Sequence, residues 1–477
     1  MRLKILQVST SDDRGGAATV ASSLHSAFRS RGFEGMMAVG SRHTRDDHVF
    51  EIPNEQARKT WARSWNRAAA FTNRALPRVK GSGRIAQMMR TIGSPASAFD
   101  RWYGRENFDY PGTWKVLTLQ REMPDIVQLH NLHGDYFDLR ALPWLSHRVP
   151  TAITLHDAWM LSGHCAHSFD CGRWETGCGS CPDLSIPPAV TRDDTAANWQ
   201  RKQAIYAKSK LYVITPSAWL MRKVHHSMLA AAAVETRVIP NGVDLAVFNP
   251  GSRQEARARL DLPQDAEILL FAANGIRNNP WKDYRSLQQA VRILAASARA
   301  KLLFIALGEA APDEQIGDAT IRFKPFTDSR DQVADYYRAS DVYVHAARVD
   351  TFPNTIIEAL ACGTPVVATG VGGIPEQIQS LAGWTAGDTA PNGEGASTAT
   401  GIVVEPGDGE ALGRAAEHLL KDSRLRMTIG ENAARDAHQR FSLAVQVDAY
   451  LSLYKTMLAN ARDRSDLGEL PRAESLV

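Results

Sequence analysis

The sequence lacks any long apolar run, and this excludes a membrane-spanning helix. Its longest stretch of apolar residues covers residues 228–234, whereas a transmembrane helix needs about 20. The first eight residues predict a short, mostly apolar strand, but the chain turns polar at Ser9 and no cleavable signal core follows. We therefore expect a cytoplasmic protein.

Two nucleotide-binding signatures are also missing. The pair Gly15-Gly16, after the first predicted strand, does not have the G-x-G-x-x-G spacing of dinucleotide sites. No D-x-D triplet, typical of metal-dependent nucleotide-sugar chemistry, occurs either. The glycine pair either makes a plain tight turn or lets a phosphate or polar ligand approach the start of a helix.

Acidic residues are absent between residues 56 and 99, although the whole chain has a net charge of only +3. Nine basic residues occupy this stretch: Arg58, Lys59, Arg63, Arg67, Arg74, Arg78, Lys80, Arg84 and Arg90. Large apolar residues such as Trp61, Phe71 and Met88 alternate with them. This composition is typical of a segment that lies on an anionic membrane surface, although an exposed helical insertion with solvated charges is an equal alternative. Nucleic acid is disfavoured because no RNA- or DNA-binding signature accompanies the charges.

The 477 residues suit two large domains, and the alternation of short β-rich runs with helices predicts the α/β class. We expect two consecutive Rossmann-like, doubly wound domains. The predicted strands are 3–8, 35–40, 125–129, 151–155, 211–214, 236–239, 267–272, 301–306, 321–323, 342–345, 366–368 and 402–404, and helices include 17–31, 284–298 and 354–361.

We predict a first domain over residues 1–215 and a second domain over 216–441. A helix over 442–460 is expected to return to the first domain, before a tail at 461–477. The first domain carries the basic insertion 56–99 and a cysteine-rich loop 163–182, and residues 381–401 are predicted as a loop. Ligands of doubly wound sheets bind beyond the carboxyl ends of the strands, so the loops there are the candidate sites.

Two such loops carry charged residues suited to a nucleotide sugar. Arg277 and Lys282 can together neutralise a diphosphate leaving group in place of a metal ion. Asp350 and Glu358 are eight positions apart, one in a loop and one on a helix. Such a carboxylate can accept the hydroxyls of a ribose, while the N–H groups of Asn354 and Thr355 face a phosphate. Residues 370–376 repeat the pattern of a glycine-rich turn entering a helix.

The combination of these motifs resembles the retaining family-four glycosyltransferases of GT-B fold. The resemblance rests on residues 350–365, Asn241-Gly242-Val243-Asp244, the Arg277/Lys282 pair and Gly15-Gly16. Within that family, Leu155-His156-Asp157, Gly163-His164-Cys165 and residues 177–182 are similar to the bacterial exopolysaccharide or colanic-acid subset.

The resemblance implies that residues 1–215 form the acceptor-side domain and residues 216–441 the nucleotide-sugar-binding domain. It also implies a role for each matching residue. Glu358 is implied to bind the donor ribose, and Asp350 to lie beside the transferring sugar, where the commoner residue is Glu. His156 is implied to contact the donor sugar, so His156 and Asp350 are the catalytic candidates. The remaining implied donor-binding residues are Gly15, Gly16, Arg277, Lys282, Phe352, Asn354 and Thr355. One departure is Asp283, which follows Lys282 where glycine is usual.

The implied reaction is transfer of a sugar from a nucleotide-diphosphate donor to a saccharide or lipid-linked acceptor, with retention and without a catalytic metal. This would serve polysaccharide biosynthesis, with the enzyme cytoplasmic or peripheral at the inner face of the cell membrane. The alternatives are an epimerase or phosphorylase of the same fold, or a non-catalytic nucleotide-sugar-binding protein.

Cysteine is scarce, and four of the five cysteines fall in one loop: Cys165, Cys171, Cys178 and Cys181. In a cytosolic chain this clustering suits a structural zinc site, with free buried thiols and disulfides as the alternatives. His130 and His133 end a predicted strand and are candidate acceptor contacts.

Overall fold

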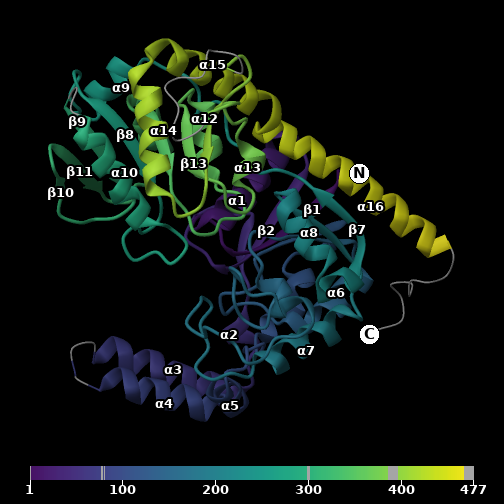
Figure 1. Cartoon of the computed structure of the whole chain (residues 1–477). Coiled ribbons are helices and arrows are strands. Elements are labelled where there is room, and N and C mark those ends of the chain that lie inside the picture. The colour runs from purple at the N-terminus through teal and green to yellow at the C-terminus, as the bar shows by residue number, and fades with distance from the viewer. Residues whose placement is uncertain (1, 77–78, 80, 298–300, 385–395, 467–477) are drawn as a thin grey trace. The chain divides into compact units, whose positions relative to one another are not determined.

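The computed structural model describes residues 2–76, 79, 81–297, 301–384 and 396–466, which form two α/β units (Figure 1). The first unit comprises Met1–Thr215, Met221–Val238 and the chain from Tyr450 onward. The second comprises Pro216–Leu220 and Ile239–Ala449. The expected fold of two Rossmann-like sheets is confirmed.

The first unit is built on a seven-stranded parallel sheet with strand order β3-β2-β1-β4-β5-β6-β7. The central strands β4, β5 and β6 are buried along their whole length, as expected for parallel strands covered on both faces. The strands are β1 (Lys4–Ser11), β2 (Glu34–Ser41), β3 (Val49–Glu51), β4 (Ile126–His130), β5 (Thr151–Thr154), β6 (Leu211–Thr215) and β7 (Ala233–Val238).

Helices and short 3-10 turns connect these strands. They are α1 (Gly16–Ser30), α2 (Asn54–Ala57), α3 (Thr60–Ala75), α4 (Ser82–Gly93), α5 (Pro95–Tyr103), η1 (Pro111–Thr118), η2 (Leu139–Ala141), α6 (Leu142–Arg148), η3 (Trp159–Leu161), η4 (Arg173–Glu175), α7 (Thr195–Tyr206), α8 (Ala218–His225) and η5 (Met228–Ala232).

The second unit has a seven-stranded sheet with order β10-β11-β9-β8-β12-β13-β14. All neighbouring strands are parallel except β10, which pairs antiparallel with β11. The strands are β8 (Glu267–Ala272), β9 (Leu302–Leu307), β10 (Glu314–Ile316), β11 (Ala319–Lys324), β12 (Val342–His345), β13 (Val366–Thr369) and β14 (Gly401–Val404). The helices are α9 (Arg253–Arg259), α10 (Tyr284–Ala296), α11 (Arg330–Ala339), α12 (Asn354–Ala361), α13 (Ile374–Gln377), α14 (Gly409–Lys421) and α15 (Ser423–Arg440).

The boundary between the units differs from the expected break at residue 215. The strand expected at 236–239, which we took to open the second domain, is β7, and it pairs in parallel with β6 of the first sheet. Its edge position adds a seventh strand to that sheet, so residues 221–238 belong with the first unit. The chain therefore changes unit after β6, within α8, after β7, and again within the last helix, α16 (Leu443–Asp466).

Helix α16 is anchored to the first sheet by buried tyrosines. The hydroxyl of Tyr450 lies 2.7 Å from that of Thr154 in β5, and the hydroxyl of Tyr454 donates to Gln128 in β4 at 3.2 Å. Both tyrosines are fully buried. This helix continues past residue 460, where we expected the tail to begin, and residues 467–477 of that tail lie outside the described part of the chain.

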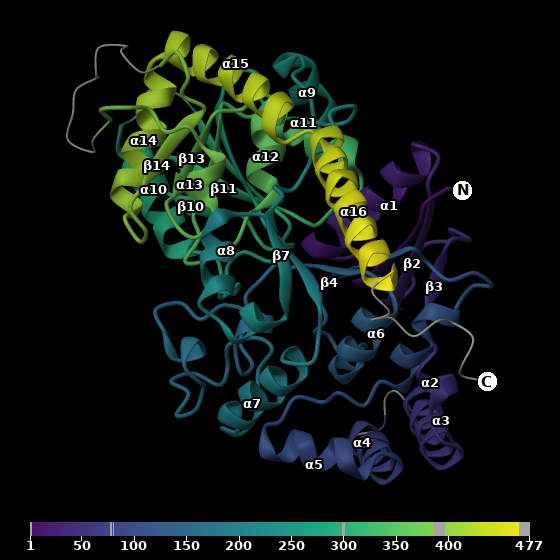
Figure 2. The same ribbon diagram turned by 90° about the vertical axis from the view of Figure 1, so that its right-hand side faces the viewer.

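The basic insertion folds as the helical group α3, α4 and α5. Figures 1 and 2 show these helices side by side, away from the sheet of their own unit. Of its nine basic residues, Arg78 and Lys80 lie outside the described residues, as do residues 385–395 of the loop predicted at 381–401. None of the helices that the structure describes is long and apolar enough to cross a membrane.

Candidate functional site

The second unit gathers a lysine, a histidine and an aspartate at the carboxyl ends of its central strands. Lys282 lies in the loop after β8, His345 ends β12, and Asp350 follows β12. The ammonium of Lys282 donates to Asp350 Oδ2 at 2.7 Å and to His345 Nε2 at 3.2 Å. The parallel sheet produces this cluster, because β8 and β12 are hydrogen-bonded neighbours.

Asp350 remains ionised in this setting. Burial by itself would raise its pKa, but the charge of Lys282 and the hydrogen bond that Lys282 donates outweigh that effect. The pKa of Asp350 therefore lies well below the usual 3.8. A carboxylate with this pairing is an acceptor for hydrogen bonds and a fixed negative charge.

His345 is neutral, and its partners define its tautomer. Burial and the neighbouring Lys282 charge lower its pKa to about 4. Because an ammonium group only donates, Nε2 must accept from Lys282 and the ring proton sits on Nδ1. Nδ1 then donates to the Tyr343 hydroxyl at 3.0 Å, which donates in turn to the carbonyl of Ala272. His345 thus fixes the position of the Lys282 ammonium.

The second carboxylate, Glu358, lies one turn into α12. Its Oε2 accepts a hydrogen bond from the Tyr337 hydroxyl at 2.9 Å. Burial raises its pKa, opposed by that hydrogen bond and by the charge of Arg330. Among the described residues no hydrogen bond joins Glu358 to Asp350, so the two acids can serve different parts of one ligand.

The start of α12 offers backbone donors. No side chain among the described residues caps this helix. Asn354, at its first position, accepts a hydrogen bond from the Asn241 amide at 2.9 Å, which links the Asn241-Gly242 motif to the helix. Phe352, expected at the donor site, is instead a core residue, because its buried ring packs edge-on against Phe441 at 5.8 Å.

The glycine turn after β13 holds the Asp350 loop by backbone contact. A Cβ at Gly372, where φ is +59°, would lie 1.8 Å from the carbonyl oxygen of Asp350. A Cβ at Gly373 would lie 2.0 Å from the carbonyl oxygen of Thr351, and the Gly373 N–H donates to the Asp350 carbonyl at 3.3 Å. Only glycine permits this approach, so residues 370–376 position Asp350. Glu376, at the end of this segment, accepts from the Ala218 and Trp219 N–H groups, each at 2.7 Å.

Arg277 does not converge with Lys282 in this structure. Its Nε donates to Glu309 Oε1 at 2.7 Å, while Glu309 Oε2 accepts from the Ile276 and Arg277 N–H groups. Asp283, which departs from the usual glycine, is accommodated because its carboxylate caps α10 by accepting from the Ser286 N–H at 3.1 Å.

In the first unit, the glycine pair opens α1. Gly15 precedes the helix with a φ of +95°, and a Cβ at Gly15 or Gly16 would meet nothing within 4 Å. The backbone at this helix start is therefore approachable by a ligand.

Two histidines from neighbouring strand ends form a buried pair. His130 Nδ1 and His156 Nε2 are 3.0 Å apart, and His130 Nε2 lies 2.9 Å from Gln7 Oε1. Burial lowers the pKa of His130 well below 6.5 and that of His156 to about 4, so both are neutral. If Gln7 accepts, His130 Nδ1 accepts from His156 Nε2–H and leaves His156 Nδ1 as an acceptor. This corrects the expected acceptor contact of His130, which has no exposed surface and uses both ring nitrogens within the protein.

His133 and Asp157 form an ion pair at the same end of the sheet. Their Nε2 and Oδ2 atoms are 2.8 Å apart, and the side chain of His133 is 25% exposed. Burial lowers the pKa of His133, but the Asp157 charge and hydrogen bond raise it above 6.5 overall. Burial likewise opposes ionisation of Asp157, yet His133 and the neighbouring donors bring its pKa down to about 2.

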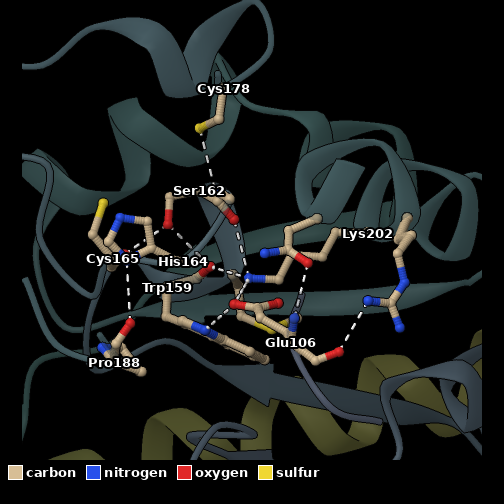
Figure 3. Close-up of polar contacts among 12 residues, drawn as sticks. Glu106, Trp159, Ser162, His164, Cys165, Cys178, Pro188 and Lys202 are labelled. Atoms are coloured by element: carbon tan, nitrogen blue, oxygen red, sulfur yellow. Dashed lines mark hydrogen bonds and ion pairs between the residues drawn. The ribbon is translucent and has the colours of Figure 1, made fainter. Parts of the chain in front are cut away.

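A buried lysine that sequence reasoning missed holds the residues just before the cysteine-rich loop (Figure 3). Lys202 is fully buried, and its ammonium donates at 3.0 Å to Glu106 Oε1 and to the carbonyls of Trp159 and Ser162. It also lies 3.7 Å from the centroid of the Trp159 ring. The residue spacing along α7 did not predict that this lysine is buried, because its partner Glu106 is 96 residues away in the sequence.

The four clustered cysteines are free thiols that act as hydrogen-bonding groups. Cys181 Sγ lies 3.3 Å from His164 Nε2, and Cys178 Sγ accepts from the Gly163 N–H at 3.2 Å. Burial raises the pKa of Cys165 to about 11 and also raises those of Cys178 and Cys181. Among the described residues, no group of three or more His, Cys, Asp or Glu side chains is placed to hold a metal ion. The structural zinc site expected at Cys165, Cys171, Cys178 and Cys181 stays a prediction.

Two family models match the chain. Residues 14–247 match "Glycosyltransferase Family 4" and residues 252–436 match "Glycosyl transferases group 1".

Curated relatives are similar over part of their length. D-inositol 3-phosphate glycosyltransferase 1 of Catenulispora acidiphila is 29% identical over 345 residues, which cover 69% of this chain and 75% of that protein. D-inositol 3-phosphate glycosyltransferase of Kineococcus radiotolerans is 31% identical over 271 residues, which cover 53% of this chain and 58% of that protein.

Solved structures share the fold at low identity. HepE of Anabaena, solved in complex with UDP-glucose, has a TM-score of 0.57 at 17% identity, covering 95% of this chain and all of that chain. A glycosyltransferase of Rickettsia africae has a TM-score of 0.59 at 16% identity, covering 96% of this chain and 99% of that chain.

Replacing Lys202 by Met should lower the free energy of unfolding by about 3–5 kcal/mol, because it leaves the buried Glu106 carboxylate unpaired. Urea denaturation measures this, and the exposed Lys208→Met on the same segment is the control. Equal unfolding midpoints for the two variants would contradict the buried pair.

The His133–Asp157 pair should give a pH-dependent stability. Because the pKa of His133 is raised, the pair stabilises the fold below pH 6.5 and is lost as the pH rises through the folded-state pKa. At the acid end it is lost as the pH falls from about 3.8 through the Asp157 pKa of about 2.

Asp157→Asn should therefore bring the pKa of His133 below 6.5, since burial then acts without the opposing carboxylate. Histidine NMR titration measures this, with the resonance identified by its loss in His133→Ala. The exposed Asp170→Asn is the control, and an unchanged His133 pKa in Asp157→Asn would refute the assignment.

Proposed function

Because the chain belongs to the GT-B glycosyltransferases, we propose that it transfers a sugar from a nucleotide-diphosphate donor to a saccharide acceptor with retention of configuration. The single observation that supports this best is the grouping of Lys282, Asp350 and the uncapped start of α12 at the carboxyl edge of one sheet. Positive charge, negative charge and backbone donors there match the parts of a nucleotide sugar.

The ribose is assigned to Glu358. Tyr337 occupies its Oε2, and Oε1 is the oxygen proposed to accept from a ribose hydroxyl. The backbone N–H groups of Asn354 and Thr355 are proposed to face the diphosphate, where the helix dipole favours negative charge.

Lys282 and Arg277 are proposed to neutralise the diphosphate as it leaves, without a catalytic metal. Lys282 is already fixed by His345 and Asp350. Arg277 would have to exchange Glu309 for the ligand, and this exchange costs little because its side chain is 36% exposed.

Asp350 is proposed to act as a fixed charge beside the transferring sugar. Its pairing with Lys282 makes it a weak nucleophile, which favours departure and attack on the same face of the sugar, with the leaving diphosphate accepting the acceptor proton. In the first unit, His156 Nδ1 is proposed to accept from a sugar hydroxyl, and His133 to contact the acceptor.

Two acceptor classes are supported by different observations. The motifs around His156 and the cysteine-rich loop favour a saccharide, free or lipid-linked, in exopolysaccharide biosynthesis. The names of the curated relatives favour an inositol phosphate instead. An epimerase or phosphorylase, and a non-catalytic binding protein, fit less well because neither accounts for the Lys282–Asp350 pair together with Glu358.

A donor panel tests the proposal. The full chain is incubated with UDP-, GDP-, ADP- and TDP-sugars, first alone and then with inositol 3-phosphate or a lipid-linked saccharide. We expect slow hydrolysis of one donor and transfer of its sugar to one acceptor. NMR of the product should show the same anomeric configuration as in the donor. If the chain neither bound nor turned over any of the donors, the transferase proposal would be refuted.

With the donor identified, Glu358→Gln should weaken nucleotide binding by about 10- to 100-fold, because a hydrogen bond to a charged acceptor is lost. Calorimetric titration with the matching nucleoside diphosphate measures the change. Glu410→Gln on the exposed face of α14 is the control, and wild-type affinity in Glu358→Gln would remove the ribose assignment.

Asp350→Asn should lower kcat by about 100-fold while nucleoside diphosphate affinity changes less, because the charge acts at the transferring sugar. Asp350→Glu keeps that charge and should retain more activity than Asp350→Asn. Equal kcat values for Asp350→Asn and the wild type would show that the charge has no part in the reaction.

A further inference from the structure

A cavity of about 730 Å³ lies in the first unit, between the helices of the basic insertion and the chain that precedes η1. This volume is in the range of small-molecule sites. Five of the side chains that line it are arginines: Arg58, Arg63, Arg67, Arg90 and Arg101. The only acidic residues in its lining are Glu55 and Asp135. Neither the donor site nor the acceptor-side histidine pair uses this cavity.

Part of this charge is neutralised within the protein. Arg58 donates to Asp109 at 2.6 Å and to Glu55 at 3.1 Å. Asp135 accepts a hydrogen bond from the Tyr110 hydroxyl at 2.6 Å. Both acidic groups in the lining are therefore already engaged.

The positive charge of Arg63, Arg67 and Arg90 is not neutralised in this way. Within the described residues, their guanidinium groups form no ion pair or hydrogen bond. Arg63 and Arg67 are four positions apart on α3, the spacing that places side chains on one helical face, and Arg90 reaches the cavity from α4. Several arginine forks around one cavity suit a phosphate or diphosphate, because each fork can donate two parallel hydrogen bonds to such a group.

The same helices expose large apolar side chains to solvent. Trp61 is 61% exposed, Phe71 72% and Met88 65%, and Ile85, Phe99 and Trp102 are each more than half exposed. Such a set of exposed apolar residues marks an interaction surface, and aromatic residues beside cations suit the boundary between lipid headgroups and acyl chains.

We propose that the arginine-lined cavity binds the phosphate or diphosphate group of a membrane lipid, while the exposed apolar side chains of α3, α4 and α5 enter the headgroup region around it. This gives the insertion a specific ligand site, beyond a general attraction between a basic segment and an anionic surface. A soluble phosphate compound would satisfy the arginines but would give no reason for the exposed Trp61 and Phe71.

The chain offers a matched pair of variants. Arg67→Ala/Arg90→Ala removes one cavity arginine from α3 and one from α4. Arg74→Ala/Arg84→Ala removes one exposed arginine from each of the same helices, outside the cavity lining. Since both pairs remove two charges, general attraction to an anionic membrane falls about equally, by about fivefold for each arginine.

Binding of the full chain is measured by co-sedimentation with vesicles of phosphatidylcholine alone and of phosphatidylcholine with phosphatidylglycerol. We expect preference for the anionic vesicles, and an affinity in the cavity variant about tenfold or more below that of the exposed variant. Arg67→Lys/Arg90→Lys keeps the positive charges but loses the two-pronged guanidinium donors. Its affinity for the anionic vesicles should lie between those of the wild type and the cavity variant. Thermal unfolding and donor hydrolysis should be unchanged in all variants, which separates this proposal from that of the reaction.

Equal losses in the two alanine variants would overturn the cavity as a site, because general attraction would then explain the binding. If the same amount of the chain sedimented with both kinds of vesicle, an anionic membrane lipid would be overturned as the source of the phosphate group. Phe71→Ser and inorganic pyrophosphate distinguish the remaining source. Wild-type vesicle binding in Phe71→Ser, combined with tight pyrophosphate binding lost in the cavity variant, would assign the cavity to a soluble phosphate compound and refute the lipid.

Discussion

The ion pair between Lys282 and Asp350 is the interaction on which the candidate donor site depends. It joins the loops after two neighbouring strands, and it is fixed from one side by the neutral His345 and from the other by the glycine turn at Gly372 and Gly373. The pair keeps Asp350 charged despite its burial, and it holds the Lys282 ammonium at the carboxyl edge of the sheet. A substitution in any of these elements would therefore act on the same two charges.

The first unit uses buried polar groups differently. His130 has no exposed surface and orients His156, while Lys202 links Glu106 to the carbonyls of Trp159 and Ser162, just before the cysteine-rich loop. Both groups are costly to bury unless every partner is present, so they position the loops around them instead of meeting a ligand themselves. The sulfur atoms of Cys178 and Cys181 add contacts with the Gly163 N–H and with His164.

The helical insertion shows why net charge is a poor guide to the partners of a protein. The charge of +3 averages over a chain in which a single cavity gathers five arginines. The linear pattern indicated that this segment is basic and partly apolar, but it did not separate Arg67 and Arg90, which line the cavity, from Arg74 and Arg84, which do not. Only the packing of α4 against α3 and α5 makes that distinction.

The sequence by itself determined the two-sheet architecture, because the alternation of apolar strands and helices is local: β8 and β12 begin and end where predicted, and α12 does as well. It also indicated which loops carry charged residues, since these follow strand ends. The tertiary structure decided the partners of those residues. It assigned β7 to the first sheet, buried Phe352, directed Arg277 to Glu309, and brought Lys202 to Glu106, which is 96 residues away in sequence. These outcomes depend on strand order and on contacts distant along the chain, for which local periodicity and spacing contain no signal.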